Sequence, residues 1–175
     1  MPPLLRRHWH TGKRDNPSVL QSRQSGIRGG LWETAGFDWN GRAMRVIAEG
    51  LFTDGNPPHL IGGRERESGR VVFPCPPGDR YEPVALSRTG TLWSYTIQRY
   101  RPKSPPYAGP EAFRPWPVGY VELPGEVIVE ARLANVAFED IRIGMPLELT
   151  LVPLDPDAAE PVMIHAFQPI EGAGA

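Results

Sequence analysis

The sequence predicts a mainly β protein whose second half closes into a small barrel. Short runs of β-branched and aromatic residues follow one another at close spacing between residues 91 and 151, with glycine and proline between them. No long helical period runs through this part. The chain also contains 21 prolines and 19 glycines, which disfavour long helices and favour turns and short strands. These features together indicate a closed or nearly closed β-barrel.

Five runs supply the expected barrel strands. They are residues 91–99, 118–123, 126–133, 145–151 and 162–167. In residues 126–133 apolar side chains alternate with partly charged ones, which predicts a packed interior and a mostly wet outer face. The same alternation places Leu147, Leu149 and Leu151 on one face.

The faces of the first run are also predicted from alternation. Strict alternation puts Leu92, Ser94 and Thr96 on one face, and Trp93, Tyr95 and Ile97 on the other. Two connections are also expected: a single helical turn at residues 138–141 and an acidic hairpin loop at residues 154–160.

Two elements are expected before the barrel. Val46, Ile47, Leu51 and Phe52 have the spacing of one helical face, so a helix of about two turns is predicted within residues 44–59. Residues 59–78 follow as two extended pieces around a turn at Ser68 and Gly69, and the second piece has strong β character.

Charge is unevenly distributed along the chain. Residues 1–43 hold seven Lys/Arg and three Asp/Glu, a net charge of +4, so the remaining residues carry −5 of the total of −1. Residues 1–43 are polar and show no hydrophobic periodicity, which predicts a disordered arm. The same pattern is expected if the start codon is placed too far upstream, and Met44 is then the alternative start. A nucleic-acid role for this basic arm is the other interpretation, but the net acidic barrel is not expected to bind polyanions by bulk charge.

Localisation is predicted from what the sequence contains and lacks. The one cysteine excludes an internal disulfide and fits a reducing cytoplasm. No apolar run approaches the roughly 18 residues that span a bilayer. The basic N-terminus is not followed by an apolar core, so no secretory signal is expected.

Five short motifs occur in consistent order between residues 44 and 170. They lie at residues 68–74, 86–94, 118–123, 142–146 and 166–169. Together they resemble the thiolase-associated family of rubredoxin-like zinc-ribbon and OB-fold proteins. The resemblance implies a five-stranded OB-fold barrel preceded by a degenerate ribbon. The domains are then 1–43, a basic arm; 44–82, the short helix and ribbon; 83–170, the barrel; and 171–175, a tail.

The ribbon of this family holds zinc through two cysteine pairs, and this chain departs from that pattern. Glu65 and Ser68 stand where the first pair is expected, and the second is reduced to Cys75. A structural zinc site needs four good ligands, and Cys75 with Glu65 and His59 would be a poor substitute. No metal is therefore expected here, and the pair His8 and His10 also has too few partners.

Cys75 can be interpreted in two ways. A catalytic cysteine needs a neighbouring base or a helix N-terminus, and the sequence offers neither. A structural role is the favoured interpretation. The histidines also lack a serine, cysteine or carboxylate partner at a recognisable spacing, so no catalytic residue is predicted.

The loop between the first two barrel strands is long and unusual in composition. Residues 100–117 include six prolines, and long loops inside compact domains are often functional. The prolines would hold the loop extended and lower the ordering cost of binding. Three basic and three aromatic residues form the candidate binding site, for which the resemblance implies CoA or a partner protein: Arg99, Arg101, Lys103, Tyr107, Phe113 and Trp116.

The resemblance implies a non-catalytic accessory subunit that binds a thiolase-like or lipid-transfer-type enzyme in a hetero-oligomer. Such a protein helps to form the acyl-CoA channel of its partner, so acyl-CoA is the one ligand expected, shared with that enzyme. The alternative is a single-stranded nucleic-acid-binding OB-fold, which uses aromatic platforms in a basic groove. A free-standing acyl-CoA carrier or thioesterase is a third interpretation, which is disfavoured because no base and nucleophile are paired.

Overall fold

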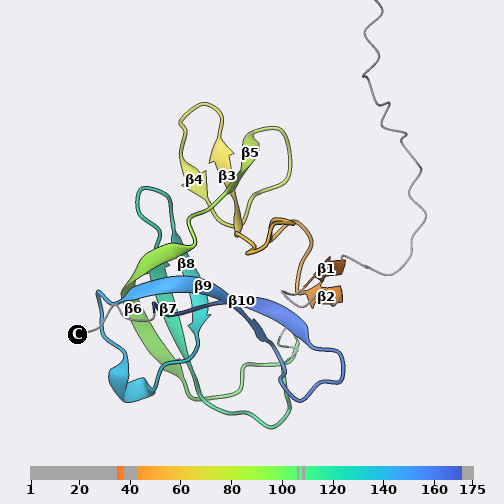
Figure 1. Cartoon of the computed structure of the whole chain (residues 1–175), viewed down its shortest axis with the longest axis vertical. Coiled ribbons are helices and arrows are strands. Elements are labelled where there is room, and N and C mark those ends of the chain that lie inside the picture. Colours follow the sequence, from red (N-terminus) through yellow and green to blue (C-terminus); the bar gives the residue numbers. More distant parts are fainter. Residues whose placement is uncertain (1–34, 38–42, 106, 108, 171–175) are drawn as a thin grey trace, which may run out of the picture. The chain divides into compact units, whose positions relative to one another are not determined.

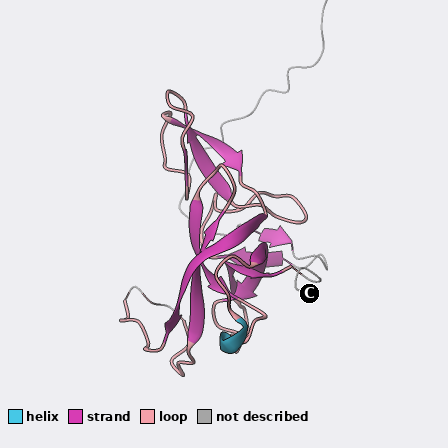
Figure 2. Ribbon diagram, turned by 90° about the vertical axis from the view of Figure 1, so that its left-hand side faces the viewer, coloured by secondary structure: helices cyan, strands magenta, loops and turns pink. Residues whose placement is uncertain are grey.

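The computed structural model describes residues 35–37, 43–105, 107 and 109–170, which belong to one compact unit, Glu33–Ala175. The strands are β1 (Ala35–Phe37), β2 (Ala43–Val46), β3 (Ile61–Glu65), β4 (Val71–Val72), β5 (Tyr81–Ala85), β6 (Thr89–Gln98), β7 (Trp116–Glu122), β8 (Ile128–Leu133), β9 (Pro146–Pro153) and β10 (Val162–Pro169). Within these ranges the one helix is a short 3-10 turn, η1 (Phe138–Asp140), as Figure 2 shows. No described helix has the length and apolar character that a membrane crossing requires. The mainly β prediction is confirmed.

Strands β6 to β10 form the predicted barrel. The order around it is β10–β8–β7–β6–β9, and β9 then pairs antiparallel with β10 and completes the circle (Figure 1). The contact of β10 with β8 is parallel, at Ala166–Arg132 and Phe167–Leu133, while the other contacts are antiparallel. Closure removes the free edges that an open sheet would expose. The five-stranded OB-type barrel is confirmed.

The barrel interior is filled by alternate residues of its strands. Five side chains with no exposed surface come from the five strands in turn: Leu92, Val121, Val129, Leu147 and Phe167. Complete burial of a side chain of this size contributes about 1.5–3 kcal/mol. The alternation predicted for residues 126–133 and for Leu147 and Leu149 agrees with the burial of β8 and β9.

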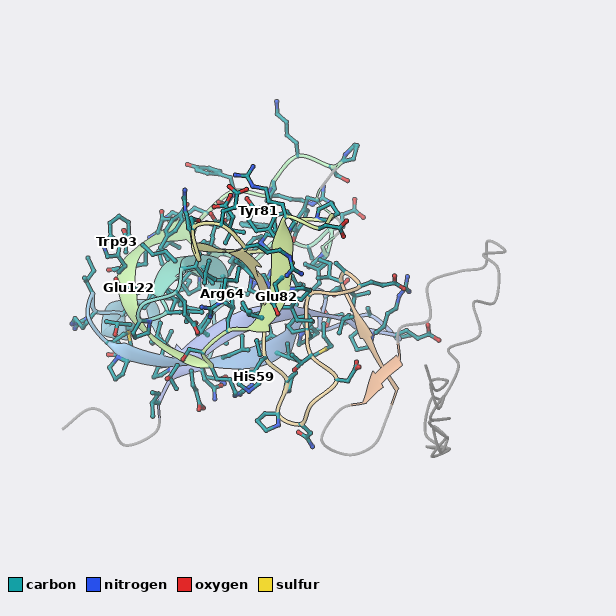
Figure 3. All side chains as sticks on the ribbon, turned by 90° about the horizontal axis from the view of Figure 1, so that it is seen from above. His59, Arg64, Tyr81, Glu82, Trp93 and Glu122 are labelled. Carbon is teal, nitrogen blue, oxygen red and sulfur yellow. The ribbon has the colours of Figure 1, made fainter. Side chains whose placement is uncertain are left out.

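A β-bulge in β6 contradicts the strict alternation predicted for that strand. Leu92 pairs with Val121 and Ser94 pairs with Tyr120, so Trp93 lies between them without a partner on β7. Leu92 points into the barrel, whereas Ser94 lies on the outer face with Tyr120. The extra residue resets the pattern, as bulges do. Trp93 is 57% exposed and points away from the barrel in Figure 3.

Strands β4, β3 and β5 form a separate three-stranded sheet, the ribbon. β3 and β4 are the two extended pieces predicted around Ser68 and Gly69, and Gly69 has φ +72°, which favours glycine. Sequence reasoning missed β5, which pairs along the whole of β3. The ribbon shares the barrel core through Leu60 and Leu86, and the ring of Phe73 meets the ring of His165 edge-on at 5.6 Å.

The helix predicted within residues 44–59 is absent from this described segment. Its first residues instead form β2, which pairs in parallel with β10, and the amide of Ile47 extends this pairing to Met163. Gly50, with φ +68°, then turns the chain. Strand pairing with the barrel has thus overridden a weak helical period. Residues 35–37 form β1 although they were predicted as part of the arm; the predictions for residues 1–34 and 171–175 lie outside the described residues.

Candidate functional site

The loop predicted as the binding site leaves the barrel after β6 and returns at the start of β7. Gln98 and Trp116 pair at the base of the loop, so both ends are fixed by the same pair of strands. Tyr107 N donates to the carbonyl of Lys103, which closes a turn within it. Residues 106 and 108 lie outside the described residues. The barrel thus anchors the loop at both ends.

The three predicted aromatic residues come together. Tyr107 stacks on Trp116 with ring centroids 6.0 Å apart and planes 15° apart. Phe113 approaches the same indole at 5.0 Å with a tilt of 58°. All three side chains are half-buried. Aromatic pairs at such distances contribute about 0.5–1.5 kcal/mol each beyond the area they bury, so the loop has a core of its own.

The three predicted cations lie on the outgoing half of the loop and are exposed. The Arg101 guanidinium lies 5.6 Å from the centroid of the Tyr107 ring, and its Nε makes a long contact of 3.5 Å with the carbonyl of Pro110. Arg101 therefore braces the loop as well as presenting charge. Arg99 and Lys103 extend the basic character on either side of it.

Arg132 of β8 belongs to this cluster, and sequence reasoning missed it. Its guanidinium lies 4.6 Å from the centroid of the Trp116 ring, a cation–π distance. The alternation of residues 126–133 placed Arg132 on the outer face, but nothing in the sequence indicated that Trp116 would return above it. Burial lowers the pKa of Arg132, and Tyr107 partly opposes this change. An arginine stays charged in spite of such a shift.

Two buried donors of the cluster have no hydrogen-bond partner within the described part of the chain. They are the Tyr107 hydroxyl and Nε of Arg132. Buried polar groups are almost always paired, and both of these need an oxygen acceptor. Because both donors are enclosed by the cluster, the surface that the loop presents consists of its exposed cations and the outer faces of the half-buried rings.

The chemistry-bearing residues of the ribbon make different contacts. The Glu65 carboxylate binds Ser68 and Arg80, and Nδ1 of His59 donates to the carbonyl of Leu86 at 2.8 Å. Cys75 Sγ makes only a weak contact with the carbonyl of Pro76, at 3.6 Å. Among the described residues, no group of three or more His, Cys, Asp or Glu side chains could hold an ion. This donor set does not fit a tetrahedral zinc site, which needs four free ligands.

Taken together, the closed barrel and the long loop between its first two strands define an OB-fold protein with an elaborated β6–β7 connection. A family model described as "ChsH2, C-terminal OB-fold domain" matches residues 83–152. The benzoylsuccinyl-CoA thiolase subunit BbsA of Thauera aromatica is 31% identical over 105 residues, which are 56% of this chain and 67% of that protein. The chain belongs to the thiolase-associated family of OB-fold proteins that its sequence resembles.

Two archaeal relatives are named DUF35 domain-containing scaffold proteins. The one from Methanocaldococcus jannaschii is 28% identical over 121 residues, 64% of this chain and 82% of the relative. The one from Pyrococcus furiosus is 36% identical over 96 residues, 51% of this chain and 66% of the relative. A solved structure entitled "Ltp2-ChsH2(DUF35) aldolase" aligns with a TM-score of 0.49 and 24% identity, over 63% of this chain and 84% of that chain.

Proposed function

We propose that this chain is a non-catalytic accessory subunit that binds a thiolase-like or lipid-transfer-type enzyme and helps to form the acyl-CoA site of that enzyme. The names of its relatives, two scaffold proteins and a thiolase subunit, support an accessory role with an enzyme of this kind. The observation that carries the proposal is the braced loop of residues 99–115, which presents three exposed cations, one of which, Arg101, lies over the aromatic cluster.

The chemistry of acyl-CoA matches these two parts of the site. Arg99, Arg101 and Lys103 are exposed and can meet the CoA phosphates, for which arginine provides several donors in a planar arrangement. The half-buried rings of the same loop provide apolar surface for the pantetheine arm or for partner side chains. The acyl-CoA is shared with the partner, in a hetero-oligomer that we place in the cytoplasm.

The outer wall of the barrel disfavours the nucleic-acid alternative. Tyr120 is 40% exposed there, but its hydroxyl donates to the Glu130 carboxylate at 2.8 Å. Glu122 lies two residues from Tyr120 on the same outer face and is exposed as well. Carboxylates beside the aromatic platform repel a phosphate backbone, whose binding depends on neutralising cations.

Copurification from the source cells tests the proposal. Tagged full-length chain is expected to bring down a thiolase-fold enzyme, identified by mass spectrometry, and to increase that enzyme's activity on an acyl-CoA. The charge reversals Arg99→Glu and Lys103→Glu leave the Arg101 brace in place and should weaken both effects. The matched control is Arg45→Glu with Arg64→Glu, which changes the net charge equally at exposed positions of β2 and β3.

Two outcomes would contradict the proposal. The first is retention of single-stranded oligonucleotide, with binding that falls steeply as salt rises. The second is turnover of a thioester by the isolated chain.

A further inference from the structure

We propose that two arginines, Arg66 and Arg80, cross-link the tip of the ribbon at the place where the ribbons that this chain resembles hold a zinc ion. The tip consists of two loops: the turn of residues 66–69 between β3 and β4, and the loop of residues 73–80 between β4 and β5. In a zinc ribbon each such loop supplies two ligands, and the ion joins them. Here each loop contributes one arginine that reaches across the tip: Arg80 reaches Glu65 at the end of β3, and Arg66 reaches the loop of residues 73–80.

The first cross-link joins the Arg80 guanidinium to the Glu65 carboxylate. Arg80 Nε donates to one carboxylate oxygen of Glu65 at 2.6 Å, and its guanidinium forms an ion pair with the same oxygen. The Ser68 hydroxyl donates to the other oxygen. The Glu65 side chain is only 12% exposed, whereas Arg80 is 71% exposed. Glu65 and Ser68, which stand where the first cysteine pair is expected, therefore form a negatively charged site that binds the Arg80 guanidinium.

The second cross-link joins Arg66, in the first loop, to the backbone of the loop of residues 73–80. Arg66 Nε donates to the carbonyl of Asp79 at 2.9 Å, and the amide of Arg66 donates to the carbonyl of Arg80 at 3.1 Å. Arg66 also lies 4.0 Å from the Glu82 carboxylate. Figure 3 labels Arg64, Tyr81 and Glu82, which lie on the neighbouring strands β3 and β5; Arg66 directly follows β3, and Arg80 directly precedes β5. The two loops are thus joined by reciprocal contacts.

The remaining thiol takes part in packing. The backbone amide of Cys75 donates to the carbonyl of Ile61 at 3.3 Å, which places the side chain over β3. A Cβ on Gly63 would lie 3.1 Å from Cys75 Sγ and 2.9 Å from Pro76 Cδ, so this loop rests on the bare backbone of the glycine. Both oxygens of Glu65 are in use, and Cys75 has no second thiol beside it. The contacts that a metal would make between the two loops are replaced by the hydrogen bonds and the ion pair of Arg66 and Arg80.

An exposed clamp of charged groups needs no metal, but it weakens with salt and with acid. The hydrogen bond from Ser68, then that from Arg80, lowers the pKa of Glu65 from its ordinary 4.5. Because the folded pKa lies below the unfolded one, the contribution of Glu65 is complete above about pH 4.5 and is lost as the pH falls through the folded value.

Metal analysis and hydrogen exchange on the full-length chain test the inference. Protein purified with zinc in the growth medium is expected to carry no stoichiometric zinc, and amide exchange in β3 and β5 should be unchanged by a chelator. Arg80→Gln and Glu65→Gln should each speed exchange at residues 61–85 about fivefold, with the barrel amides unaffected. Arg64→Gln, at an exposed arginine of β3 with no ion pair within the described residues, is the matched control.

Two results would overturn the inference. One is a zinc ion bound at one per chain, whose removal speeds exchange of the ribbon. The other is exchange of the Arg80→Gln and Glu65→Gln proteins that matches the Arg64→Gln control.

Discussion

The guanidinium of Arg132 lies 4.6 Å from the centroid of the Trp116 ring, so a strand in the barrel wall contacts the aromatic cluster of the β6–β7 loop. Trp116 also holds Tyr107 and Phe113, while Arg101 lies over Tyr107. The contacts thus run without interruption from β8 to the exposed part of the loop. A loop braced in this way loses less conformational entropy when it binds.

A double-mutant cycle measures the contact between Arg132 and Trp116. Arg132→Gln removes the cation, and Trp116→Leu removes the ring while keeping an apolar side chain. The two changes together should cost about 1 kcal/mol less than the sum of the single changes, because each one already breaks the same contact. Urea unfolding of the four proteins gives the coupling energy. Additivity within about 0.3 kcal/mol would show that the two groups do not interact energetically.

The pH dependence of stability should report on His165. Nε2 of this residue lies 3.0 Å from the carbonyl of Glu130, and Nδ1 is buried without a partner in the described part of the chain. Burial lowers the pKa of His165 from its ordinary 6.5, although the contact with Glu130 opposes the change. Below about pH 6.5 the unfolded chain binds more protons than the folded chain, so the free energy of unfolding should fall as the pH drops.

His165→Leu isolates this effect. The variant should show a shallower loss of stability than the unmodified chain between about pH 7 and about pH 5, because the proton uptake linked to unfolding is gone. Denaturant titrations at several pH values provide the slopes. Parallel slopes for the two proteins would contradict the assignment to His165.

Most of the barrel could be predicted from sequence because period-two alternation directly reports which side chains face a core. The failures have local causes. Trp93 forms a bulge, and the alternation of apolar and polar residues does not show where a strand contains an extra residue. Val46 and Ile47 have helical spacing, but β10 offers them a strand partner that only the folded barrel creates. The meeting of Trp116 with Arg132 depends on the path of a proline-rich loop and on strand register, which no local pattern records.

Two glycines of the barrel should differ in their tolerance of alanine. A Cβ on Gly90 would lie 2.5 Å from the backbone oxygen of Glu122, which cannot move without disturbing β7. A Cβ on Gly119 would meet only side-chain atoms, Leu133 Cδ2 at 2.7 Å and Leu92 Cδ1 at 2.9 Å. Gly90→Ala should therefore destabilise by about 3 kcal/mol and Gly119→Ala by about 1–2 kcal/mol.

Gly55→Ala is the control for this pair, since its nearest neighbours would be 3.6 Å away and its stability should change by less than about 0.5 kcal/mol. Thermal or urea unfolding ranks the three variants. If Gly119→Ala were the more damaging barrel variant, the close approach of Gly90 to β7 would not be the limiting contact.

Arg88 joins three segments although no carboxylate pairs with it among the described residues. Its guanidinium donates to the carbonyl of Pro58 and, at 2.8 Å, to that of Leu149, while its own carbonyl accepts from the Leu149 amide at 2.6 Å. Arg88→Met keeps most of the side-chain volume but leaves two partly buried carbonyls without their donor. The loss should be about 1–3 kcal/mol, larger than for Arg45→Met at an exposed position. Equal stability of the two variants in urea would show that water replaces the guanidinium at no cost.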